Sequence, residues 1–389
     1  MATVATPQRF WIGRPLWLVG FRPFFLLAVL AAIALPPIWV LLMTGVITAP
    51  TGLVPMTWHA HEMFFGFGFA VLGGFLLTAS KNWVSVRGHY GHTLQFLVAA
   101  WVFERAVMWW GGSWPFWIRV ACLNLYTVTL VGLVSWTLVR HRKSDSYRDN
   151  ALFLIALPLF VAARTLLLDP AHFAQGRDLT LGIFRLAFVV MLERTSVPFM
   201  KAAFQIALPR RPFVDGPIKG LALLLVGAAW LPSSVRTIAE VLLAALFFGR
   251  WLTWSPQLAL RRIELAVMYL GGVALCAQLV LDAWGAAWVG SMPLHVFTFG
   301  VMGLIIPAML IRIGLGHTGR PVTFERRDRL ALWVMVLAFF ARVVMPQLDP
   351  SHYATWIWIA ALGWMTCFAM VGVRIAPMLL TERVDGREH

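Results

Sequence analysis

Long apolar stretches, separated by short polar segments, follow one another along the whole chain. A helix needs about 20 mainly apolar residues to cross a bilayer, and we expect twelve such helices. They lie near residues 17–43, 59–80, 94–111, 115–139, 151–168, 179–200, 217–233, 238–258, 263–284, 293–315, 329–347 and 353–380. Of the 389 residues, 60% are hydrophobic and only 13% are charged, about half the charged share of a soluble domain. The predicted fold class is an all-α, polytopic membrane helical bundle that forms one integral membrane domain.

Lys and Arg residues are distributed unevenly over the loops between these stretches. Most of the 32 fall at the chain ends and in every second loop, whereas the opposite loops hold only Arg177 and Arg236. Cytoplasmic loops carry the excess of positive charge, so we expect both termini in the cytoplasm. The net charge of +15 then reflects these loops, and the expected partner is the lipid bilayer, with no nucleic acid. The first apolar stretch is too long for a signal-peptide core, so we expect no cleaved signal.

Two segments of the chain resemble each other. Residues 147–174 and 325–354 both run Arg-Asp, an apolar stretch, Ala-Arg, and then Asp-Pro-x-His-aromatic-Ala. The matching polar residues are Asp149 and Asp328, Arg164 and Arg342, and His172 and His352. The offset is six predicted helices, so we expect two parallel six-helix repeats, with halves 1–205 and 206–389. Chance resemblance between two apolar helices is the alternative.

Two histidines and a glutamate open the second apolar stretch, which reads WHAHEMFFGFG from residue 58. Residues three or four apart share a helix face, so His59 lies with Met63 and a row of small residues, whereas His61 lies on a bulkier face. The two imidazoles bind one metal only if the helix begins after His59; otherwise they belong to two sites. The small residues indicate close helix packing or, alternatively, space for a flat macrocycle below an axial histidine.

A second histidine pattern opens the tenth stretch. His61 and His295 both begin the pattern His-x-x-x-Phe-Gly, at residues 61–66 and 295–300. Polar groups at membrane depth are costly and are functional candidates. Imidazole ligates haem iron and suits copper, and a thioether adds affinity for Cu(I). We therefore predict a metal site from His59, His61, His295 and Met63, against the alternative of structural histidines.

Carboxylates and arginines accompany these histidines. Glu62 and Glu104 are the candidate catalytic residues, because a carboxylate can fix an imidazole tautomer or deliver protons. Four arginines lie at a similar expected depth: Arg105, Arg164, Arg185 and Arg342. Each alone could pair with a buried carboxylate such as Glu104, but four without four matching acids suit an anionic head group such as the propionates of haem. The three cysteines form no CxxCH sequence, so a haem would be bound non-covalently, as a b-type haem.

The predicted cytoplasmic side has histidines of its own. His89 and His92 follow the second stretch, His317 follows the tenth, and Arg312 and Arg320 flank His317. These residues are candidates for a second cofactor-binding site. Histidines in loops are more often solvated than ligating, which is the alternative.

Three segments together resemble the NnrS family, whose members respond to nitric oxide. They are PLWLVGFRPFFLLA (15–28), the stretch that begins WHAHEMFFGFG (58–83), and HVFTFGVMGLIIPAMLIRIGLGHTGRP (295–321). The resemblance implies a polytopic protein of the bacterial inner membrane with about twelve spans, carrying haem and copper, and associated with denitrification and relief of nitrosative stress. The recurring histidines of the family fall on His59, His61, His89, His295 and His317.

The expected function is therefore that of a haem protein, or a haem-copper protein, that binds or converts nitric oxide or a species derived from it. An oxidoreductase with an electron donor of unknown identity, a scavenger and a sensor would share these sequence features. A different class remains open, namely a proton-coupled transporter in which Glu104, Glu193, Glu240 and Asp282 exchange protons. A carrier of haem or of metal is the third alternative.

Overall fold

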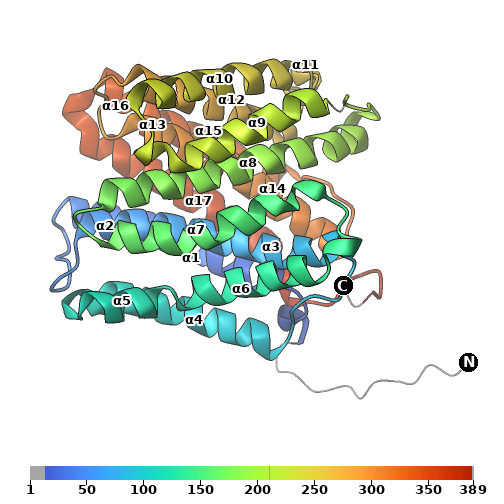
Figure 1. The fold of residues 1–389 in the computed structure, drawn as a ribbon, viewed down its shortest axis with the longest axis horizontal. Coiled ribbons are helices and arrows are strands. Elements are labelled where there is room, and N and C mark those ends of the chain that lie inside the picture. Colours follow the sequence, from blue (N-terminus) through green and yellow to red (C-terminus); the bar gives the residue numbers. More distant parts are fainter. Residues whose placement is uncertain (1–13, 210, 388–389) are drawn as a thin grey trace, which may run out of the picture.

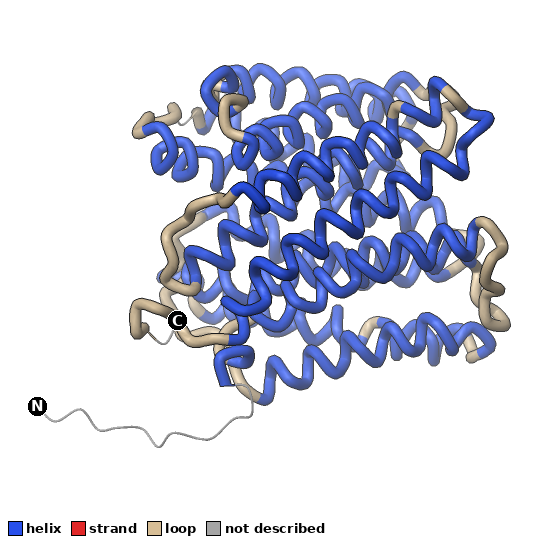
Figure 2. Tube along the Cα trace, turned by 180° about the vertical axis from the view of Figure 1, so that it is seen from behind, coloured by secondary structure: helices blue, strands red, loops and turns tan. Residues whose placement is uncertain are grey.

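The computed structural model describes residues 14–209 and 211–387, which form helices joined by turns and loops (Figures 1 and 2). No strand occurs among these residues, which confirms the all-α prediction. The first half contains α1 (Phe21–Met43), α2 (Pro55–His61), η2 (Glu62–Gly68), α3 (Phe69–Trp83), α4 (His92–Trp110), α5 (Phe116–Leu123), α6 (Leu125–Arg140), α7 (Ala151–Leu168) and α8 (Phe173–Phe204). The second half contains α9 (Pro212–Leu224), η6 (Leu225–Trp230), α10 (Ser233–Leu252), α11 (Pro256–Ala259), α12 (Ile263–Trp284), α13 (Met292–His295), η7 (Val296–Gly303), α14 (Leu304–His317), α15 (Arg326–Val343), α16 (Met345–Leu348) and α17 (Tyr353–Leu380).

Eight of the described helical segments are long and apolar enough to cross a membrane, and the pair α5–α6, bent by 45°, brings the number to nine if it is one span. Helices α4, α8 and α10 occupy the remaining predicted positions but are not among these segments. Large apolar side chains on the surface, such as Trp136, Leu337 and Val373, are suited to contact with lipid. The chain is thus a multi-pass membrane protein, and the count of twelve spans stays a prediction.

Both ends of the described chain lie at one end of the bundle, here named the termini end (Figure 1). Arg22, in the first turn of α1, donates from Nη1 to the carbonyl oxygens of Leu379, at 2.9 Å, and Thr381, at 2.7 Å. Helices α2 and α13 lie at the opposite end, here named the His59 end (Figure 1). The two ends of the described chain therefore lie at the same end of the bundle, whereas their placement in the cytoplasm stays a prediction.

The two similar segments form similar helix pairs, α7–α8 and α15–α17. Each pair has an acid–arginine contact near the termini end, an Asp–His contact in the connecting turn, and an arginine that reaches a histidine of another helix. The matching contacts are Arg194–Asp149 and Arg374–Asp328, His172–Asp169 and His352–Asp349, and Arg164–His61 and Arg342–His295. These shared contacts support duplication of the helix pair, and the parallel six-helix halves stay a prediction.

Glycines bring the second helix close to its neighbours. A Cβ atom on Gly73 would lie 2.4 Å from the hydroxyl oxygen of Tyr126, and one on Gly74 would lie 2.8 Å from Cβ of Phe24. Such distances are far below van der Waals contact, so no larger residue fits without displacement. The small-residue face of this helix therefore serves close packing, the first of the two explanations expected from the sequence.

Candidate metal centre

Three of the four predicted metal ligands line one cavity. His59, Met63 and His295 border a space of about 190 Å³ at the His59 end, together with Arg342. Side chains of α1, α2, α8, α15 and α17 complete its wall. This space is named the His59 cavity below. His61 is not among its lining residues, so the structure separates His61 from the other three.

His59 projects into the cavity from α2, which begins with a proline at its first position, where a missing N–H costs nothing. Its ring stacks on the indole of Trp39, with 4.2 Å between ring centroids and 18° between planes. The Nδ1 atom of His59 is buried and has no hydrogen-bond partner. Met63 follows one helical turn later and borders the same space.

His295 reaches the cavity from the end of α13. Its Nδ1 atom lies 3.0 Å from the carbonyl oxygen of Ser291, so Nδ1 carries the proton and Nε2 carries the lone pair. The Nη2 atom of Arg342 lies 3.1 Å from Nδ1 and 3.0 Å from Nε2, so it faces the ring and is not aimed at the Nε2 lone pair, and it donates to the carbonyl oxygen of Gly290 at 3.1 Å. This arrangement fixes the imidazole orientation from two sides.

Unpartnered polar atoms gather around the His59 cavity. Besides Nδ1 of His59, the buried Nη1 atom of Arg342 and the buried Nε1 atom of Trp364 have no hydrogen-bond partner. Buried polar atoms of proteins are almost always paired, and exceptions call for an explanation such as an ion or ligand. The cavity therefore presents one unpaired imidazole nitrogen and two unpaired donors to a polar occupant.

His61 belongs to a separate buried network. The Nε atom of Arg164 donates to Nε2 of His61 at 2.8 Å, and Nδ1 of His61 then donates to Oε1 of Glu62 at 2.9 Å. Nη2 of Arg164 donates to Oε2 of Glu104 at 2.8 Å, and Nε of Arg105 lies 2.8 Å from Oε2 of Glu62. Both ring nitrogens of His61 are thus engaged, which leaves no lone pair for a metal in this arrangement.

Two carboxylates and two guanidinium groups balance in this network, so its formal charge is zero when His61 is neutral. Arg105 and Arg164, predicted to hold an anionic head group, have carboxylate partners from the protein itself. Arg185 donates to Oε1 of Gln278 at 3.2 Å and lies 3.7 Å from the carboxylate of Asp282. Among the described residues, Arg342 alone of the four predicted arginines has no carboxylate within ion-pair distance.

The two predicted residues of the second site lie apart. His317 borders a cavity of about 220 Å³ at the termini end, together with Asn82 and Arg194, and His89 is not among its lining residues. The Nε2 atom of His89 instead lies 3.1 Å from the hydroxyl oxygen of Thr137, and burial lowers the pKa of His89. The structure therefore does not assemble a site from both histidines.

Side chains that commonly ligate metals do not cluster at the His59 end or at the termini end of the described chain. Within residues 14–209 and 211–387, no group of three or more His, Cys, Asp and Glu side chains is placed to hold a metal ion. A metal in the His59 cavity would accordingly rely on two imidazoles and the Met63 thioether. Sequence reasoning missed Trp39 and Trp364, because tryptophans are frequent in this chain and nothing in their local pattern marks a cavity.

Comparison with known proteins identifies a family for this chain. Residues 15–383 match the family model described as NnrS protein, which spans nearly the whole chain. No curated protein matches the chain significantly. The match includes the segments that carry His59, His61 and His295, and the protein belongs to the NnrS family.

Proposed function

We propose that this protein binds nitric oxide, or a species derived from it, at a metal centre held by His59 and His295. Membership of the NnrS family supports a role in the response to nitric oxide. The observation that carries the proposal is the buried, unpartnered Nδ1 atom of His59 in a cavity that His295 also borders. A bound metal would supply the coordination position for the small ligand.

Haem and copper are the two candidate cofactors. Two imidazoles suit either metal, and the thioether of Met63 favours Cu(I). The unpartnered Nη1 atom of Arg342 suits a haem carboxylate. Pockets for large organic ligands measure roughly 300–1,000 Å³, whereas the His59 cavity measures about 190 Å³. A copper ion with a small ligand fits this volume, whereas a haem is larger than it.

Four further residues in or near the His59 cavity have separate roles. Arg342 offers a charged donor to an anionic group beside the metal, and Trp39 fixes the plane of the His59 ring. Glu62 and Glu104 do not line the cavity. We propose that these two carboxylates position Arg164 and His61. Glu62 lies within hydrogen-bond distance of His61 and Arg105, and Glu104 lies within hydrogen-bond distance of Arg164.

Pairing of the buried acids argues against the proton-coupled transporter. Each acid that such a transporter would use lies beside a cation: Glu104 with Arg164, Glu193 with Lys219, Glu240 with Arg236, and Asp282 with Arg185. A carboxylate that exchanges protons during transport must become neutral, which a neighbouring cation opposes. Three of the four pairs join two helices, whereas Glu240 and Arg236 lie in one helix, so these acids are better suited to stabilising the bundle.

Orientation completes the proposal. We place the protein in the bacterial inner membrane with its termini end in the cytoplasm, because most Lys and Arg residues in loops belong to the side that holds the chain ends. The His59 cavity then opens towards the periplasm. Nitric oxide is neutral, so it reaches this cavity from water or from lipid.

The test is an absorption spectrum with metal analysis of the purified full-length protein, before and after addition of nitric oxide. We expect a bound metal and a spectral change with nitric oxide, both reduced at least tenfold in His59→Ala and His295→Ala. His172→Ala is the matched control, since His172 lies in an exposed turn and pairs with Asp169. Metal-free, colourless protein after expression with ample haem and copper would refute the proposal and favour the transporter.

A further inference from the structure

Three cavities follow one another along the same three helical segments. The segment from α2 to α3, helix α8, and the segment from α13 to α14 each line the His59 cavity first, then a middle cavity, and finally the cavity at the termini end. On α8 the order is Arg177, then Ala187, then Arg194. The cavities therefore form a row through the bundle, roughly along the direction in which the helices run.

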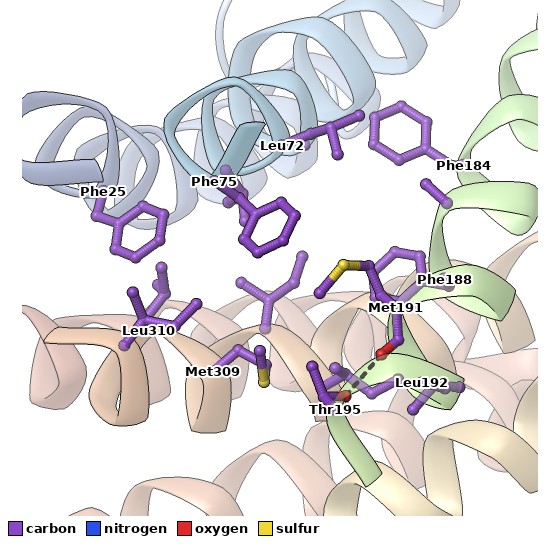
Figure 3. A pocket seen from close by; sticks show the side chains of 16 residues that line it. Phe25, Leu72, Phe75, Phe184, Phe188, Met191, Leu192, Thr195, Met309 and Leu310 are labelled. Carbon is purple, nitrogen blue, oxygen red and sulfur yellow. Dashed lines mark hydrogen bonds between the residues drawn. The ribbon is translucent and has the colours of Figure 1, made fainter. Parts of the chain in front are cut away.

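The middle cavity is almost entirely apolar. It measures about 70 Å³, and among its sixteen lining residues are Leu72, Phe184, Met309 and Leu310 (Figure 3). Thr195 is the one lining residue with a polar side chain, and its hydroxyl donates to the carbonyl oxygen of Met191 at 2.7 Å. Water needs two to four polar partners to occupy a cavity, and apolar cavities stay dry. The space therefore suits an occupant without hydrogen-bonding groups.

Volume restricts the occupant further. An apolar cavity of roughly 150 Å³ admits benzene or xenon, and the middle cavity has about half of that volume. A diatomic molecule or a noble-gas atom fits this space, which is open past the partly exposed side chains of Phe75, Met191 and Thr195. The side chains of Phe75, Met191, Thr195, Met309 and Ile313 line both this cavity and the cavity at the termini end.

Aromatic rings separate the middle cavity from the His59 cavity. The ring of Phe64, which borders the His59 cavity, lies 5.5 Å from that of Phe184, which borders the middle cavity. Phe188, which also lines the middle cavity, contacts the ring of Phe297, with 5.9 Å between ring centroids. At Phe64 and Phe184 the two cavities are thus one ring–ring contact apart.

We infer that the middle cavity is a binding site for a small, neutral, apolar molecule inside the bundle. Resting on the proposed function, the natural occupant is nitric oxide, which would be held within one aromatic contact of the His59 cavity. The lining at α3, α8 and α14 recognises it by shape and by the absence of polar groups. The site is distinct from the metal centre, since the two cavities share no lining residue.

Xenon is the probe, because it binds apolar cavities without any metal. Crystals of the full-length protein are pressurised with xenon, and its anomalous scattering locates the atoms. We expect a xenon atom in the middle cavity of the unaltered protein and none in Ala187→Leu or Thr195→Leu, whose longer side chains extend into this space. Thr165→Leu is the matched control, because Thr165 also donates to its own helix, to Val161, and lines none of these cavities.

The outcomes separate the two proposals. A xenon atom that persists in both filled variants, or an acyl chain of lipid or detergent in the cavity, would overturn the inference. So would an empty cavity in the unaltered protein under a pressure at which xenon enters other apolar sites of the same crystal. Loss of metal in the spectroscopic test, with xenon still bound, would refute the metal centre and leave the middle cavity in place.

Discussion

Arg164 is the residue whose removal we expect to weaken the fold most. Its side chain is fully buried and donates at 2.8 Å to each of three groups: Nε2 of His61, the hydroxyl of Thr127 and Oε2 of Glu104. In Arg164→Met, the Glu104 carboxylate stays buried and keeps the backbone N–H of Tyr126 as a donor, with Arg105 as its nearest cation at 3.6 Å. The variant thereby leaves the Glu104 carboxylate without its closest cation and Nε2 of His61 without its donor.

The magnitude follows from the loss of that cation. Removal of one partner from a buried ion pair costs about 3–5 kcal/mol, whereas replacement of both partners by uncharged groups is often close to neutral. We therefore expect about 3–5 kcal/mol for Arg164→Met. In Arg164→Met with Glu104→Gln, the cost should fall at least about 1.5 kcal/mol below the sum of the single variants, within the range seen for contacting residues.

The assay is unfolding in mixed micelles with a rising fraction of dodecyl sulfate, followed by the fluorescence of the 20 tryptophans. Arg177→Met is the control: Arg177 also contacts an acid at 2.8 Å, but its side chain is 38% exposed. An exposed pair contributes at most about 1 kcal/mol. Equal costs for Arg164→Met and Arg177→Met, or strictly additive costs in the double variant, would refute this account of the network.

Two further predictions concern packing and pH. Gly73→Ala should lower the unfolding free energy by about 1–3 kcal/mol, because the new Cβ would lie 2.4 Å from the Tyr126 hydroxyl oxygen; Gly132→Ala, with nothing within 4 Å, should not. Equal melting temperatures for the two variants would contradict this. Hydrogen bonds, first of all from Ser351, lower the pKa of Asp349 to about 2. The stabilising effect of the ionised Asp349 is thus complete above about pH 4 and lost towards about pH 2. In Asp349→Asn, the melting temperature should therefore depend less on pH over that interval. A pH dependence equal to that of the unaltered protein would contradict this.

Sequence periodicity predicted much of the site at the His59 end. His59 and Met63 were expected on one helix face and His61 on another, since residues four apart share a face and residues two apart do not. The structure places His59 and Met63 at one cavity and His61 in a different network. Local spacing sufficed here because all three residues belong to one continuous helical segment.

Partners from distant helices could not be read in the same way. Arg164 was expected to bind an anionic head group, yet its carboxylate comes from Glu104, 60 positions away in the chain. Nothing in local spacing pairs residues at such separations, and the choice depends on how α4 and α7 both pack against α6. The same reason explains why His89 and His317, expected at one site, have different neighbours.

The two histidine patterns share one backbone feature with a consequence for how the chain can vary. Directly after His61 and His295, the segments η2 and η7 are π-helical, a form that contains one more residue per hydrogen-bonded turn than the α-helix. Each residue of an α-helix turns the chain by about 100°. Deletion of a single residue from either segment would thus swing the preceding imidazole by roughly a quarter turn, while the glycine contacts further along keep their register. An insertion or deletion in η2 or η7 would therefore change the direction of His61 or His295 without changing the helix packing that follows.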